Sequence, residues 1–243
     1  MYRFFTSLFL LIVLAAAPLK AQYATSTGTA TPDFKAQQLV APAVLLTTGT
    51  LLHCFSHDAL DVEVRDMFLE ARGASGEVKI DDYIQYLPSL ASLTLGFFGA
   101  EAEHDFFERG VQGVIGAVTL IAVNRSMKAL IYSPRPNGVD AQSFPSGHTG
   151  TAFLGAELVR KEYGWGWGSA AYAVATTTAV LRMYNNEHWL SDVIAGAGLG
   201  ILCANVGTWL RDPVTDFLHL DAWLRPVFDP LSGLLCAQVG VNF

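Results

Sequence analysis

Long apolar segments alternate with short polar stretches along this chain, and the pattern predicts helices rather than strands. The apolar segments are 39–55, 83–100, 110–123, 149–159, 165–181 and 193–210. A helix that crosses a membrane needs ~20 apolar residues, and the charge-free 193–210 segment is the strongest candidate. The central region has no alternation of apolar and polar residues of the kind that forms strands. We therefore predict an all-α, membrane-embedded bundle of five or six helices.

The first 21 residues have the pattern of a secretory signal peptide. Arg3 precedes the apolar run 4–18, and the small residue Ala21 stands at the expected cleavage point. Leu19 is larger than the residue usually found three positions before a cut, so an uncleaved anchor helix is the alternative. Both interpretations predict export from the cytoplasm.

The rest of the chain divides into three parts by composition. Residues 22–36 are rich in Thr, Ser, Ala and Gly and predict a flexible lead-in. The main helical domain is expected over 37–212. Pro213 is expected to stop its last helix, which leaves 213–243 as a C-terminal tail without recognisable chemistry.

Composition agrees with a membrane protein. Only 15% of the residues are charged, against about 25% in an average soluble domain. The net charge of -7 provides no basic field, which argues against nucleic acid as a partner. The three cysteines, Cys54, Cys203 and Cys236, lack the spacing of a metal site. We predict that they are buried free thiols.

Three polar clusters interrupt the apolar pattern between residues 128 and 192. The last cluster contains Arg182, His188 and Asp192. His188 and Asp192 are four positions apart, so on one helix face the carboxylate accepts the Nδ1 proton and leaves Nε2 as a nucleophile. The alternative is a helix whose first turn is capped by the acid. Arg182 precedes a predicted turn that directs it back toward the same site.

The middle cluster, Pro145-Ser146-Gly147-His148, comes directly before a predicted helix. Backbone N–H groups at a helix start, together with the Ser146 hydroxyl, form a cradle for an anion. Gly147 allows the main chain to approach a ligand closely, and His148 is placed to protonate a leaving oxygen. The alternative is a plain helix start with Ser146 as its N-cap.

The first cluster places Lys128 and Arg135 seven positions apart, with Pro134 and Pro136 on either side of the arginine. Arginine presents a planar fork to phosphate oxygens, whereas lysine offers a point charge. The alternative is cations that flank a membrane helix at the lipid headgroups, which fits Lys128 better than Arg135. Charges in the apolar part of a membrane protein are costly and usually functional. The three clusters together therefore indicate a site that binds and attacks a phosphoryl group.

The three clusters resemble the three-part signature of the type-2 phosphatidic acid phosphatase superfamily, which also includes bacterial acid phosphatases and vanadium haloperoxidases. They read, in order, Lys128-x₆-Arg135-Pro136, Pro145-Ser146-Gly147-His148 and Arg182-x₅-His188-x₃-Asp192. The resemblance covers residues 84–210. The family usually has Ser before the third-motif arginine, where this chain has Leu181. One phosphate hydrogen bond is therefore missing or supplied elsewhere, which concerns affinity more than reaction type.

This resemblance implies a metal-independent phosphatase whose active site lies at one membrane face. His188 would attack phosphorus and form a phosphohistidine, with Asp192 fixing its tautomer. His148 would protonate the leaving group and later activate water. Neither a metal nor another cofactor is implied. The phosphate oxygens would be held by Lys128, Arg135, Ser146, Gly147 and Arg182.

Three classes of function remain open. The first is an integral-membrane phosphatase that acts on a phosphorylated lipid, and the second is a soluble, secreted, non-specific acid phosphatase. The third is a vanadate-dependent peroxidase or a non-catalytic membrane protein. The 193–210 segment and the low charged fraction favour the first class. Its candidate substrates are lipid A phosphates and undecaprenyl pyrophosphate, which we prefer for an envelope enzyme, and phosphatidylglycerol phosphate and phosphatidic acid.

The orientation of the site depends on the N-terminal segments. The family pattern places the site in the periplasm of a bacterial cell envelope. If the signal peptide is cleaved and 39–55 crosses the membrane, three crossings precede the site, which would then face the cytoplasm. We therefore predict that 39–55 does not cross by itself after cleavage, or that the signal peptide is not cleaved and only one of the two segments crosses.

Overall fold

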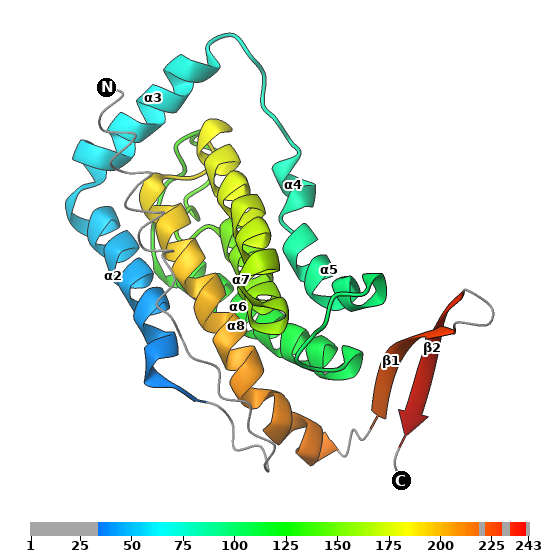
Figure 1. The fold of residues 1–243 in the computed structure, drawn as a ribbon. Helices are drawn as coiled ribbons and strands as arrows, with labels where there is room; N and C mark the ends of the chain where they lie inside the picture. The colour runs from blue at the N-terminus through cyan, green and yellow to red at the C-terminus, as the bar shows by residue number, and fades with distance from the viewer. Residues whose placement is uncertain (1–33, 219–221, 230–233, 242–243) are drawn as a thin grey trace. The chain divides into compact units, whose positions relative to one another are not determined.

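The computed structural model describes residues 34–218, 222–229 and 234–241. The predicted signal peptide (1–21) and most of the predicted lead-in (22–36) lie outside the described residues. The helical elements are η1 (Ala36–Leu39), α2 (Val40–Phe55), η2 (His57–Asp61), α3 (Val62–Arg72), α4 (Asp81–Ile84), α5 (Leu87–Thr94), η3 (Leu95–Phe98), α6 (Phe106–Leu130), α7 (Gly147–Tyr184) and α8 (Leu190–Leu218) (Figure 1).

Helix α8 packs against α2, α6 and α7. Glycine allows the closest of these approaches, because a Cβ on Gly200 would lie 2.2 Å from the backbone oxygen of Gly150 in α7. Small residues of this kind let helices pack tightly where lipid provides no hydrophobic drive for association. The small residues of 193–210 therefore belong to the centre of the bundle.

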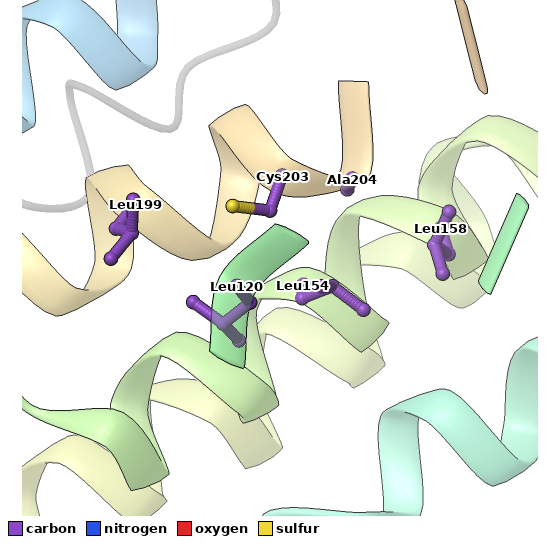
Figure 2. Close-up of a cluster of buried hydrophobic side chains, with 6 residues drawn as sticks. All are labelled: Leu120, Leu154, Leu158, Leu199, Cys203 and Ala204. Atoms are coloured by element: carbon purple, nitrogen blue, oxygen red, sulfur yellow. The ribbon is translucent and has the colours of Figure 1, made fainter. Parts of the chain in front are cut away.

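A cluster of buried apolar side chains joins α6, α7 and α8, as Figure 2 shows. Close packing of such buried apolar side chains holds the three helices together. The cluster includes the Cys203 thiol, which is buried as predicted, whereas Cys54 in α2 is exposed. Its members are Leu120, Leu154, Leu158, Leu199, Cys203 and Ala204.

Helix α7 consists of two arms, 147–163 and 165–184, joined at Gly164. Gly164 has φ 73°, a left-handed conformation that glycine adopts without steric cost. The arms lie side by side and antiparallel, since the Tyr172 hydroxyl donates to Glu157 Oε2 at 2.7 Å. The predicted break between two helices near residue 164 is therefore confirmed.

Helix α2 runs antiparallel to α8 along most of its length. Near the start of α2, the backbone oxygen of Gln38 accepts a hydrogen bond from Asn205 Nδ2 at 2.9 Å. Near its other end, a Cβ on Gly49 would lie 2.6 Å from the backbone nitrogen of Ala195. Helix α2 therefore packs against α8 near both of its ends and is part of the bundle.

The helical bundle has two ends, which we call the motif end and the far end and define by the loops that lie there. The motif end holds the loops 131–146 and 185–189, where α6 and the second arm of α7 finish and where α7 and α8 begin. Asn124 of α6 donates to the backbone oxygen of Pro145 at 3.2 Å and ties the first of these loops to the bundle. The far end holds Gly164 and the loop 99–105.

Among the residues that the structure describes, three helices are long and apolar enough to cross a membrane: Ala36–Phe55, Phe106–Leu130 and Leu190–Phe217. Together with α5 and the two arms of α7, they confirm the predicted membrane-embedded bundle of five or six helices. Strands occur, within the described residues, only in the hairpin of β1 (Ala222–Asp229) and β2 (Leu234–Val241), which pair antiparallel. This hairpin lies in the predicted tail.

Two boundaries differ from the sequence predictions. Helix α8 continues through Pro213 to Leu218, where the Thr215 hydroxyl donates to the backbone oxygens of Arg211 and Asp212 at 3.1 and 2.9 Å. These bonds support the turn around the proline. The apolar segment 83–100 is divided into three short elements, because Pro88 starts a new helix.

Candidate active site

His188 and Asp192 face each other in a buried position at the motif end. His188 lies in the loop before α8 and Asp192 in the first turn of α8, with Nδ1 and Oδ2 separated by 3.2 Å. The Ser143 hydroxyl donates to the same Asp192 oxygen and lies 3.3 Å from His188 Nδ1. Asp192 also accepts the backbone N–H of Trp189 at 2.9 Å. The carboxylate therefore caps the helix and holds the imidazole at once.

The surroundings of His188 keep its imidazole neutral. Its side chain is 3% exposed, and burial, followed by the charges of Arg135, Arg182 and Lys128, holds its pKa well below the usual value. Because Nδ1 faces Asp192, Nε2 is the nitrogen that keeps a free lone pair. A neutral imidazole with this orientation is the nucleophilic form.

Arg135 reaches the site from the loop between α6 and α7. Its Nη1 donates to Glu187 Oε2 at 2.8 Å, and its Nε donates to Asp140 Oδ1 at 2.9 Å. The loop around it is anchored by Trp189, whose indole Nε1 donates to the backbone oxygen of Pro134 at 2.7 Å. The guanidinium is therefore oriented from two sides.

Arg182 reaches the same place from the last turn of α7. It is 7% exposed, and its Nη1 donates to Asp81 Oδ2 at 2.7 Å. Its Nη2 lies 3.4 Å from Glu187 Oε2, the oxygen that Arg135 also contacts. Asn185 Nδ2 donates to the other oxygen of Asp81 at 3.0 Å and fixes that carboxylate in turn.

Lys128 lies in the last turn of α6 and is directed toward the loop rather than toward the lipid. Its Nζ donates to the backbone oxygen of Ser143 at 3.2 Å and to that of Gln142. Its charge contributes to the low pKa of His188. The contacts thus favour a role in the site over the headgroup interpretation.

The middle motif forms the start of α7. Ser146 is fully buried, and its Oγ accepts from the Thr149 backbone N–H at 3.5 Å, which is the N-cap arrangement. The backbone N–H of Ser146 donates to the Asp192 backbone oxygen at 3.0 Å and joins the second and third motifs. Gly147 begins the helix, and the imidazole Nε2 of His148 lies 3.0 Å from Asp82 Oδ1.

The structure brings all eight predicted site residues to the motif end, although the contacts of Ser146 are those of a helix cap. Sequence reasoning missed the acids that hold them. Glu187 was visible as a neighbour of His188, but Asp81 and Asp82 lie about 100 positions from Arg182 in the chain, and no local pattern predicts that pairing.

A further carboxylate positions the start of α8. Asp61 is fully buried and accepts from the backbone N–H and the hydroxyl of Ser191 at 2.8 and 2.6 Å. The first N–H groups of a helix have no partner within the helix, so Asp61 satisfies one of them. His57 Nδ1 lies 3.0 Å from the same carboxylate.

This arrangement defines a class of membrane protein, a helical bundle with a buried histidine–carboxylate pair beneath three cations at one end. Residues 113–216 match the family model of the PAP2 superfamily.

Two proteins and one solved structure show the extent of the similarity. The chain is 35% identical over 158 residues to the lipid A 1-phosphatase of Porphyromonas gingivalis, covering 63% of this chain and 35% of that protein. It is 38% identical over 80 residues to the bacitracin transport permease protein BcrC of Bacillus licheniformis, covering 32% of this chain and 37% of that protein. The chain therefore spans about a third of the length of these relatives.

The fold is similar to the crystal structure of a transmembrane PAP2-type phosphatidylglycerolphosphate phosphatase from Bacillus subtilis. The TM-score is 0.54 with 17% identity, over 74% of this chain and 98% of that one. At this identity the likeness concerns the fold.

Proposed function

We propose that this chain is a membrane phosphatase that hydrolyses a phosphomonoester or pyrophosphate of a lipid through a phosphohistidine. The observation that carries the proposal is the buried His188–Asp192 pair, 3.2 Å apart, under the charges of Arg135 and Arg182. This arrangement matches the demands of phosphoryl transfer, which are a positioned nucleophile and strong stabilisation of negative charge.

In the first step, Nε2 of His188 attacks phosphorus. The N–P bond forms while the P–O bond to the lipid breaks, and His148 gives its proton to the leaving oxygen. Asp192 stabilises the positive charge that develops on the imidazole, through the Nδ1 contact at 3.2 Å. The lipid alcohol, or the lipid monophosphate from a pyrophosphate, then departs.

In the second step, His148 takes a proton from water, and the water oxygen attacks phosphorus. The O–P bond forms, the N–P bond breaks, and inorganic phosphate leaves with His188 neutral again. Lys128, Arg135 and Arg182 stabilise the phosphoryl oxygens in both steps, together with the backbone N–H of Gly147 at the start of α7.

The preferred substrate is lipid A with a phosphate at its 1-position. Its support is the 35% identity to the lipid A 1-phosphatase of Porphyromonas gingivalis. Three helices that are able to cross a membrane favour a lipid substrate over the soluble acid phosphatase alternative. Undecaprenyl pyrophosphate, phosphatidylglycerol phosphate and phosphatidic acid are the other candidates.

Release of phosphate from these four lipids and from a soluble aryl phosphate tests the proposal. We expect kcat/KM for the preferred lipid to exceed that for the aryl phosphate by at least about tenfold, because the lipid part contributes binding energy. The His188→Ala variant serves as the negative control for background phosphate release. Faster hydrolysis of the aryl phosphate would favour the non-specific phosphatase, and no release from any substrate would refute the activity.

We also propose that the active site faces the periplasm. Helix α2 runs antiparallel to α8 and toward the motif end, and Ala36–Phe55 is long and apolar enough to cross. These observations support the alternative in which the signal peptide is not cleaved and only α2 crosses. The chain would then enter α2 from the cytoplasm and reach the motif end outside.

Cysteine labelling in intact cells tests this orientation. Single cysteines at Ser75 and Gln142, in a variant without Cys54, Cys203 and Cys236, should react with a membrane-impermeant reagent. A cysteine at Glu101, in the far-end loop, should be protected until the membrane is permeabilised. The reverse pattern would place the site in the cytoplasm.

A further inference from the structure

Glu187 directly precedes His188 and joins the two arginines of the site. Its Oε2 atom lies 2.8 Å from Arg135 Nη1 and 3.4 Å from Arg182 Nη2. Its side chain is 27% exposed, whereas those of Arg135 and Arg182 are 17% and 8% exposed. One carboxylate oxygen therefore bridges two partly buried guanidinium groups.

Each arginine also has a second acidic partner that fixes its direction. Asp140 accepts from Arg135 Nε at 2.9 Å, and Asp81 accepts from Arg182 Nη1 at 2.7 Å. Glu187 is the acid that both arginines share. Holding either guanidinium in place does not need Glu187, because Asp140 and Asp81 already do so.

Carboxylate and phosphate oxygens are bound by guanidinium groups in the same way. An anion that contacts Arg135 and Arg182 together comes close to Glu187 Oε2, which accepts from Arg135 Nη1 and lies near Arg182 Nη2. A phosphate that takes these two N–H groups has to displace the carboxylate, and a phosphate that binds the remaining N–H groups is repelled by it. In either case the negative charge stays close by, because residue 187 is covalently next to His188.

We propose that Glu187 competes with phosphate for Arg135 and Arg182 and thereby lowers the affinity of the site for every phosphate. The inference rests on the proposed function and deepens it. Competition weakens binding of every phosphate by the same factor, so a small soluble phosphate is held poorly. A lipid phosphate overcomes the competition because its lipid part adds binding energy. The same competition speeds the departure of inorganic phosphate after the second step.

Inhibition by inorganic phosphate tests this role in the full chain, purified in detergent. For Glu187→Gln we expect the inhibition constant of phosphate to fall by about tenfold, since a charge-assisted contact is replaced by a neutral one. The KM for a soluble aryl phosphate and the KM for the lipid phosphate should both fall by a similar factor, so the preference between the two substrates should stay the same.

The matched control is Glu77→Gln. Glu77 is an exposed carboxylate that lies 3.8 Å from Lys79 Nζ, and its neighbour Val78 contacts Asn185 at the motif end. This variant removes one negative charge from the same end without touching either arginine. Phosphate inhibition that strengthens equally in both variants would attribute the effect to net charge and overturn the proposal.

A purely structural role predicts the opposite sign. If Glu187 only holds the arginines in place, Glu187→Gln weakens phosphate inhibition, and that result, or no change, refutes the competition. Should Glu187→Gln fail to fold, Glu187→Asp replaces it, because a shorter side chain cannot bridge both arginines and should also strengthen phosphate inhibition.

Failure of the proposed function is distinguishable from failure of this inference. Calorimetric titration with inorganic phosphate needs no turnover and measures the affinity of wild type and variants directly. Tighter binding to Glu187→Gln supports the competition even if no lipid in the panel is hydrolysed, and equal binding refutes it even if one is.

Discussion

A second buried polar cluster lies at the far end of the bundle, and its contacts differ from those at the motif end. Glu162 accepts from the His104 backbone N–H at 3.1 Å, from His104 Nδ1 at 2.9 Å and from Gln112 Nε2 at 2.5 Å. Nearby, Arg109 donates to the Tyr163 hydroxyl and lies over its ring, 5.6 Å from the centroid. These contacts join the loop 99–105 to α6 and α7.

Both ends pair a histidine Nδ1 with a buried carboxylate, so that pair alone does not identify an active site. At the far end the acid is the centre, and its direct hydrogen-bond partners are His104 and Gln112. At the motif end three cations surround the histidine, and two of them share one acid, Glu187. Three cations close to a neutral imidazole are the arrangement that phosphoryl transfer requires.

The largest expected effect comes from replacing His188 at the motif end, compared with replacing His104 at the far end. His188→Ala removes the proposed nucleophile, and we expect kcat for lipid phosphate release to fall by at least about 10³-fold with the thermal transition retained. His104→Ala should lower the transition temperature and keep kcat. Phosphate assays and thermal unfolding in detergent measure both quantities. Near-normal turnover by His188→Ala would defeat the nucleophile assignment.

The next effect concerns the far-end acid. Glu162→Ala leaves His104 and Gln112 without their buried acceptor, and we expect a loss of about 3 kcal/mol in the free energy of unfolding. Denaturant titration in detergent measures the loss. Glu101→Ala, at an exposed position, serves as the control. Its free energy of unfolding should lie within about 0.5 kcal/mol of that of the wild type. A large fall in kcat per folded molecule of Glu162→Ala would remove the distinction between the two ends.

The comparison also shows which features a sequence can predict. The four-residue spacing of His188 and Asp192 places them together wherever a helix begins near residue 190, so their contact was predictable from local geometry. The apolar segments predicted the helices for the same reason, since each depends on neighbouring residues. The prediction that Pro213 ends the last helix was wrong, because hydrogen bonds from the Thr215 hydroxyl support the turn around the proline. A rule based on the proline alone does not include these bonds.

Contacts between distant segments were not predictable. Asp81 holds Arg182 from about 100 positions away, and Asp61 caps α8 from 130 positions away. Both pairings depend on how η2 and α4 lie against the motif end, which no periodicity specifies. Glu187 is local, yet its bridge between two arginines appears only once Arg135 is brought beside Arg182.

A smaller effect concerns the turn at Gly164 that joins the two arms of α7. Gly164→Ala forces a Cβ into a left-handed conformation, and we expect a loss of about 1–2 kcal/mol in the free energy of unfolding. Gly166, two residues later, has helical geometry and nothing within 4 Å of an added Cβ. Gly166→Ala should therefore be neutral or stabilising by up to about 1 kcal/mol. Equal losses in both variants would show that the φ of Gly164 is not the cause.

The smallest effect is a shift in pH dependence that belongs to the motif end alone. A lowered pKa means that His188 stays neutral as the pH falls through 6.5, the ordinary value for histidine. The acid limb of kcat/KM should therefore lie below about pH 6.5. Arg135→Gln removes a positive charge that opposes protonation of the imidazole, so the pKa of His188 rises and the acid limb moves to higher pH, by up to about one unit.

Lys79→Met, at an exposed position, is the control and should leave the acid limb at the same pH. The midpoint of the profile is the diagnostic quantity, because losing Arg135 also lowers kcat/KM at every pH. A limb that stays in place in Arg135→Gln would mean that another ionisation, such as that of the substrate phosphate, controls it.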